Sequence, residues 1–128
     1  MIVVDEALPK MTASSAGLAL RRDGDTLWLA YLLAGDESGY AVVRFDGVDR
    51  HTFGPPNDER LHHHPLWNQG LNFYQFHRVA DAPPGKTHWI ATFHDGTLDV
   101  FASICRVVAA EVNAVNEEAA LALARGAA

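Results

Sequence analysis

Three Asp-Gly pairs constrain the fold of this chain more than any other feature of its sequence. Asp23-Gly24, Asp46-Gly47 and Asp95-Gly96 each lie between runs that are rich in β-branched or aromatic residues. Two-residue hairpin turns require positive φ at their central positions, and Asp-Gly adopts that conformation at little cost. The sequence therefore predicts three antiparallel hairpins with one of these pairs at each tip.

A two-residue turn also fixes which residues face one another across a hairpin. With the turns placed at the Asp-Gly pairs, the first two hairpins join into a meander of four strands. The cross-strand pairs predicted in this way are Leu20 with Leu27, Arg44 with Asp49, and Thr92 with Asp99.

The fold class follows from these strands and from two further segments. In residues 26–34 both the odd-numbered and the even-numbered positions are apolar. Because these positions face opposite sides of a strand, the segment predicts a central strand covered on both faces. A helix is expected near 117–125, with Asn116 and Gly126 as its caps. We expect one domain over residues 1–128, mainly β (α+β): a sandwich or partly open barrel of about six or seven strands, with the helix packed against an edge or end.

The charge balance disfavours a nucleic-acid partner. Ten Lys and Arg against 16 Asp and Glu give a formal net charge of −6, and the basic residues are scattered singly along the chain apart from Arg21 and Arg22. Phosphate backbones are bound by clustered cations.

Cysteine usage and hydropathy indicate a cytoplasmic protein. One cysteine cannot form an intrachain disulfide, which fits a reducing compartment. The N-terminal MIVVDEALPK lacks the basic and apolar regions of a signal peptide. No segment reaches the ~18 apolar residues of a membrane span, so no membrane partner is expected.

The stretch NDERLHHHPLWNQG lies within the longest polar connection, residues 54–70. Asn57 or Asp58 after two prolines is a helix start, with Glu59 in the first turn, and Pro65 ends any helix after His64. A short loop helix is therefore expected near 58–63, with its one leucine pointing into the core.

The three consecutive histidines of this loop, residues 62–64, are a weak metal signal. Neighbouring side chains are splayed by about 100° in a helix and alternate in a strand, so all three cannot bind one ion. His62 and His64 are the weak metal candidates, and they would need histidines from elsewhere in the chain. We expect no cofactor.

One face of the last hairpin carries both polar and apolar side chains, and two of the polar ones could form a functional pair. His94 and Asp99 share this face in the predicted register, and a carboxylate can orient a histidine for proton transfer. Thr92 would stand opposite Asp99 and donate to it. The alternative is that the face is simply exposed to water, as one face of an antiparallel sheet often is.

Two segments resemble a group of small uncharacterised bacterial proteins. Those proteins share a Phe-Gly-x-Pro-Asn-Asp-Glu block followed by His-Pro-Leu and Gly-Leu, and a later Phe-Thr-Phe-His-Asp-Ser-Thr-Phe-Glu strand and turn. The matching segments here are FGPPNDERLHHHPLWNQGL, residues 53–71, and ATFHDGTLDVFA, residues 91–102. The resemblance brings no activity with it, but it implies one motif set: Asn57, Asp58, Glu59, His64, His94 and Asp99.

The first functional hypothesis is a small soluble binding or interaction module. Its polar site would be formed by loop 54–70 and hairpin 88–103 and would contact a small molecule or a partner protein, with an oligomer as an open alternative. The ligand-binding candidates are Asn57, Asp58, Trp67, Tyr74 and Thr92.

The alternatives are an acid-base enzyme and a histidine-rich metal-binding protein. The enzyme would be a hydrolase, isomerase or cyclase acting on a small polar substrate, with His64 or His94 as base and Asp99 or Glu59 orienting it. It requires the loop residues and the hairpin residues to converge in one pocket.

Overall fold

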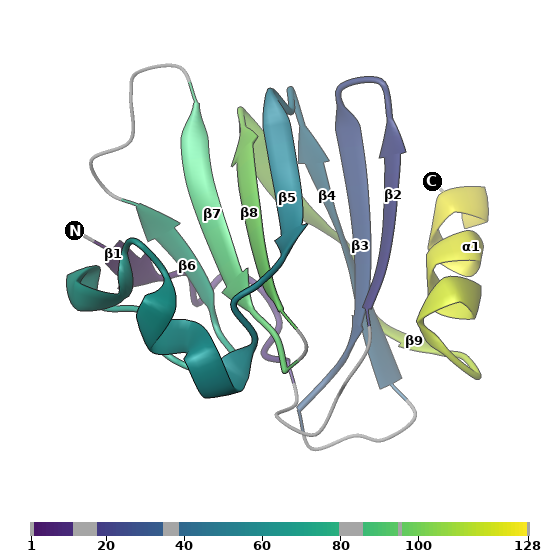
Figure 1. The fold of residues 1–128 in the computed structure, drawn as a ribbon. Coiled ribbons are helices and arrows are strands. Elements are labelled where there is room, and N and C mark those ends of the chain that lie inside the picture. Colours follow the sequence, from purple (N-terminus) through teal and green to yellow (C-terminus); the bar gives the residue numbers. More distant parts are fainter. Residues whose placement is uncertain (1, 12–17, 35–38, 80–85, 95, 128) are drawn as a thin grey trace.

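The computed structural model describes residues 2–11, 18–34, 39–79, 86–94 and 96–127. Nine strands in these ranges form two antiparallel sheets that do not close into a barrel, with a helix on the outside (Figure 1). The five-stranded sheet consists of β1 (Ile2–Val4), β6 (Phe76–Val79), β7 (Thr87–Thr92), β8 (Thr97–Ala102) and β5 (Arg50–Gly54), in that order. The four-stranded sheet consists of β2 (Leu18–Asp23), β3 (Thr26–Leu32), β4 (Gly39–Asp46) and β9 (Ile104–Asn113), in that order. The mainly β fold is confirmed, with more strands than expected.

The predicted hairpin at Asp46-Gly47 is wrong. Strand β4 pairs with β9 in one sheet, whereas β5 pairs with β8 in the other. The chain crosses between the sheets here because Val48 is buried in the core, and Gly47, at φ +65°, packs so closely on Ser103 that a Cβ would meet its Oγ at 2.5 Å. Arg44 therefore does not pair with Asp49; its Nε lies 3.1 Å from Asp46 Oδ1.

The other two hairpins form, each with its register displaced. In the first, Asp23 pairs with Thr26, so Leu20 faces Leu29 rather than Leu27. In the third, of which Asp95 lies outside the described residues, Thr92 pairs with Thr97 and Asp99 faces Ile90 rather than Thr92. Each residue's partner moves by two positions, so every side chain keeps its predicted face while its neighbours change.

The core lies between the two sheets, and β3 is its central strand. Leu27, Leu29 and Tyr31 point into this core, while Trp28 and Ala30 point to the opposite face of the same strand and are also buried. The prediction of a strand covered on both faces is confirmed.

Helix α1 (Glu117–Ala127) provides the second cover of β3. Asn116 Oδ1 accepts a hydrogen bond from Ala119 N at 2.9 Å, which confirms the N-cap. Ala120, Leu121 and Ala124 pack on the outer face of the four-stranded sheet, not against an edge or end (Figure 1). The helix continues through Gly126, which is therefore not its cap. Within the described ranges, no helix is both long and apolar enough to cross a membrane.

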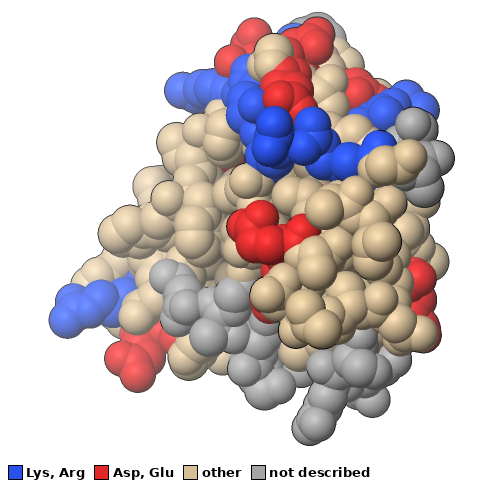
Figure 2. Space-filling model, turned by 90° about the vertical axis from the view of Figure 1, so that its right-hand side faces the viewer, with Lys and Arg blue, Asp and Glu red and all other residues tan. Residues whose placement is uncertain are grey.

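Folding gathers arginines that the sequence scatters. Asp23 pairs with Arg21 and Arg125, and Asp46 pairs in the same way with Arg44 and Arg106. The guanidinium groups of Arg44 and Arg125 also lie over the ring of Trp28. Figure 2 shows basic side chains gathered over the upper part of this face, among acidic ones. Cations that are scattered along the sequence therefore lie together in the fold, although these four arginines share carboxylate partners.

Candidate functional site

The segment between β5 and β6 covers the outer face of the five-stranded sheet. It contains two 3-10 helices, η1 (Asp58–His63) and η2 (Trp67–Gln69), so the short helix predicted near 58–63 is confirmed. Leu61 is buried against Ile90, together with Ile2 and Leu71. The mixed face of the last hairpin is therefore largely covered by this segment and is not simply exposed to water.

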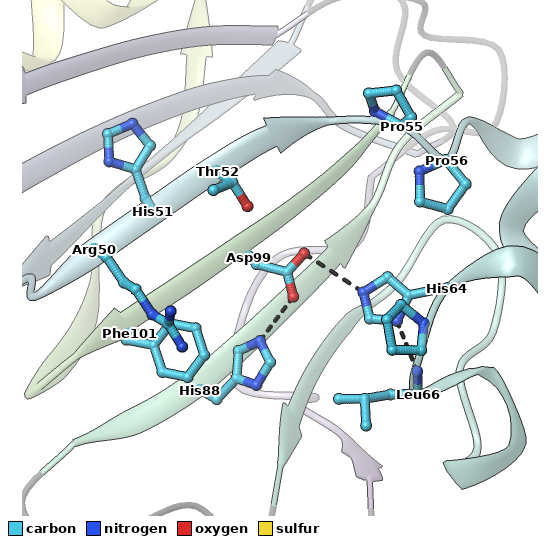
Figure 3. A pocket seen from close by; sticks show the side chains of 11 residues that line it. Arg50, His51, Thr52, Pro55, Pro56, His64, Leu66, His88, Asp99 and Phe101 are labelled. Atoms are coloured by element: carbon cyan, nitrogen blue, oxygen red, sulfur yellow. Dashed lines mark hydrogen bonds and ion pairs between the residues drawn. The ribbon is translucent and has the colours of Figure 1, made fainter.

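Asp99 of β8 is the point where the covering loop meets the hairpin (Figure 3). His88 Nε2 donates to Asp99 Oδ1 at 2.7 Å, and His64 Nε2 donates to Asp99 Oδ2 over a longer 3.5 Å. The Asp99 side chain is 21% exposed and those of His64 and His88 are buried further. The carboxylate thus bridges one histidine of the loop and one of β7.

The hydrogen bonds fix the tautomers of the two histidines. Leu66 N donates to His64 Nδ1 at 3.0 Å, so the ring proton of His64 is on Nε2 and both of its nitrogens are occupied. His88 must also carry its proton on Nε2, because a carboxylate only accepts. Its Nδ1 has no hydrogen-bond partner among the described residues and points away from Asp99 (Figure 3).

The same contacts keep Asp99 ionised. Burial raises the pKa of its carboxyl, but the hydrogen bonds from His64 and His88 outweigh burial and lower the pKa to about 2. The site therefore holds a fixed negative charge whose two oxygens are both engaged.

A pocket of about 330 Å³ opens beside this group; we call it the Asp99 pocket. Its sheet side comes from β5, β7 and β8, and its wall comes from the loop and the prolines that start it. The residues that line it are Arg50, His51, Thr52, Pro55, Pro56, His64, Pro65, Leu66, His88, Asp99 and Phe101.

Phe101 lies between Arg50 and His88 in the Asp99 pocket and contacts both. It pairs with Arg50 on one side and with His88 on the other in the sheet register. The guanidinium of Arg50 lies 4.2 Å from the centroid of the Phe101 ring, and the His88 ring stacks on it at 4.1 Å. A cation, an aromatic ring and an imidazole therefore form one row across three strands.

A second cluster, formed by Asp58, Tyr74 and His94, also ties the loop to the hairpin. Tyr74 Oη donates to Asp58 Oδ2 at 2.6 Å, and His94 Nδ1 lies 2.6 Å from the same oxygen. Asp58 N also donates to His94 O. The hydrogen bond from Tyr74 is the main cause of a lowered pKa at Asp58 and, in return, of a raised pKa at Tyr74. His94 is about half exposed, and neither it nor Asp58 lines the Asp99 pocket.

Folding thus separates the residues predicted as one site. His64 meets Asp99, whereas Asp58 meets His94. Glu59 is exposed and lies outside the Asp99 pocket. The diagonal contact predicted between His94 and Asp99 is replaced by these two pairings, because the hairpin register differs from the predicted one.

The remaining candidates do not line the Asp99 pocket. Thr92 Oγ1 donates to Asn72 O at 2.7 Å and does not donate to Asp99. Trp67 packs on Phe73 and on the apolar cluster around Leu61. The Oδ1 atom of Asn57, like that of Asp58, is buried without a hydrogen-bond partner among the described residues. His62 is exposed and its ring contacts that of His63.

His77 is a buried histidine with a structural role. Its Nδ1 donates to Ile90 O at 3.0 Å, and its Nε2 accepts from Asn72 N at 3.0 Å. Burial lowers its pKa, so the ring is neutral. Within the described part of the chain, no group of three or more His, Cys, Asp or Glu side chains could hold a metal ion.

Sequence reasoning did not name Arg50, Thr52, His88 and Phe101 as site residues, although they line the Asp99 pocket. His88 and Phe101 lie in the last hairpin, on the face predicted for Asp99. Arg50 and Thr52 come beside them through the pairing of β5 with β8, which joins segments far apart in the chain. No local pattern encodes this pairing, so the sequence held no direct signal for it.

Comparisons of the chain with protein-family models, with curated proteins and with solved structures give no match.

Proposed function

We propose that this protein is a small-molecule binding module whose site is the Asp99 pocket. The observation that carries the proposal is the partly buried Asp99 carboxylate, held by His64 from the loop and His88 from the sheet at the side of a pocket. Ligand pockets combine apolar walls with a few fixed polar groups, and this combination is present here.

The site is also held rigidly. Both nitrogens of His64 are engaged, and the Asp58 cluster ties the start of η1 to the same hairpin. A preformed pocket binds a ligand without having to order its own side chains first, which favours affinity. We place this binding function in the cytoplasm, the compartment predicted from cysteine usage.

A fragment screen followed by ¹H-¹⁵N NMR tests the proposal. We expect polar fragments to shift the backbone amides of Thr52, Leu66 and Phe101 together. The shifts should be lost in Asp99→Asn, which breaks the carboxylate bridge, and kept in Glu59→Gln, which changes an exposed carboxylate outside the pocket. A screen without a hit at these amides, or with hits that ignore the Asp99 variant, would contradict the proposal.

One observation favours an acid-base enzyme as the second candidate. The His88 imidazole is oriented by Asp99 and has its second nitrogen available, whereas His64 has none to offer. This pair matches the arrangement of a general base with its orienting carboxylate. If a fragment that binds in the pocket is also turned over, His88→Gln should abolish turnover and His94→Gln should not.

A further inference from the structure

Arg50 brings a positive charge to the Asp99 pocket. It begins the edge strand β5 and lies over Phe101, on whose ring His88 also stacks. Five other arginines form ion pairs with Asp5, Asp23 or Asp46: Arg21, Arg44, Arg78, Arg106 and Arg125. Among the described residues, no carboxylate forms such a pair with Arg50.

The carboxylate of the pocket itself does not bind Arg50. Both oxygens of Asp99 are occupied by the two histidines. Arg50 therefore presents to the pocket a guanidinium that no carboxylate of the described residues binds. Guanidinium groups bind carboxylates through two parallel hydrogen bonds, which adds geometric specificity to the attraction between the charges.

The second group that a ligand could bind is a hydrogen-bond acceptor, His88 Nδ1. With its proton on Nε2, His88 exposes the lone pair of Nδ1, which can accept a hydrogen bond from a hydroxyl or an N–H group. Arg50 and His88 both contact the ring of Phe101, so a molecule of a few carbon atoms can reach both.

From this geometry we infer that the ligand is a small organic acid with its own hydrogen-bond donor: the carboxylate binds Arg50 and a hydroxyl or amine binds His88 Nδ1. This inference rests on the proposed binding function. The prolines and Leu66 of the pocket wall would contact the carbon skeleton of the acid.

Two matched sets of probes test the inference: glycolate, glycolamide and acetate, and mandelate, mandelamide and phenylacetate. Each set contains the hydroxy acid, its neutral amide and the acid without the hydroxyl. We expect the hydroxy acid to bind about tenfold more tightly than either analogue of its set, as measured by amide shifts of Leu66 and Phe101 during titration.

Two arginine variants provide the control. Arg50→Gln should remove the preference for the acid over the amide, whereas Arg60→Gln, at an arginine of η1 outside the pocket, should keep it. Equal binding of acid and amide by the wild type, or an unchanged preference in Arg50→Gln, would overturn the inference and leave the binding pocket intact. Failure of all six probes overturns the inference, and only a fragment screen that is also empty overturns the proposed function.

Discussion

His88 Nε2 lies 2.7 Å from Asp99 Oδ1, and the two residues are diagonal neighbours on the covered face of the five-stranded sheet. Asp99 also accepts from His64 of the covering loop. One carboxylate therefore fixes the orientation of two histidines and joins two segments of the chain.

Replacement of Asp99 by asparagine should lower the free energy of unfolding by about 2 kcal/mol at neutral pH, because the pKa of 3.8 is lowered to about 2 in the fold. A lowered carboxyl pKa stabilises the fold above the unfolded-state value and loses this effect as the pH falls through about 2. Urea unfolding of the wild type and of Asp99→Asn should therefore show a difference that shrinks between pH 5 and pH 2. A difference that stays constant over this range would show that the charge of Asp99 is not its source.

Replacement of His64 by alanine should release the loop from the hairpin. The variant loses the bond to Asp99 and leaves Leu66 N without its acceptor, at a cost of about 1–3 kcal/mol. Hydrogen exchange at the Leu66 amide should become faster in His64→Ala. His62→Ala, at an exposed neighbour, should leave it unchanged; equal effects of the two variants would contradict the tautomer assignment.

Replacement of Tyr74 by phenylalanine removes the donor to Asp58 and should destabilise the fold by about 1–3 kcal/mol, because the lost hydrogen bond reaches a charged acceptor. Tyr74 holds φ +55°, a strained value for a residue with a side chain, and the hydrogen bond offsets this strain. Tyr40→Phe is the control, since the Tyr40 hydroxyl has no hydrogen bond to any described residue. An equal change of the unfolding temperature in both variants would contradict the claim that the Asp58 cluster stabilises the contact between the loop and the hairpin.

Mild acid should destabilise the protein through His77. Burial lowers its pKa from 6.5 in the fold, so the unfolded chain binds a proton first and stability falls once the pH drops below 6.5. Imidazole ¹⁵N spectra should show that the His77 ring titrates with a pKa below 6.5 and that its neutral form is protonated at Nδ1, and His77→Gln should flatten the pH dependence of the unfolding free energy. A His77 ring that titrates with a pKa at or above 6.5 would contradict this assignment.

Local patterns predicted those parts of the fold that depend on neighbouring residues. The apolar run of residues 26–34 identified the central strand, and Asn116 and the two prolines before Asn57 located the helix starts. The crossing between β4 and β5 was not predictable in this way. Asp46-Gly47 resembles a hairpin turn in the sequence. The change of sheet becomes visible only in the fold, from the burial of Val48 and from the pairing of β5 with β8.

The candidate site was predictable in its parts and not in its grouping. The loop and the last hairpin supplied His64, Asp58, His94 and Asp99 as candidates. Which of these meet depends on a hairpin register that moved by two residues and on the position of η1 over the sheet. Arg50 and Thr52 entered the site through long-range pairing alone.

The central claim is that loop and sheet form one ligand site around Asp99, and intermolecular nuclear Overhauser effects to a bound fragment test it most directly. The account predicts contacts from one fragment to both the Phe101 ring on the sheet and the methyl groups of Leu66 on the loop. Contacts to only one of the two residues, or to neither, would contradict a site shared by loop and sheet.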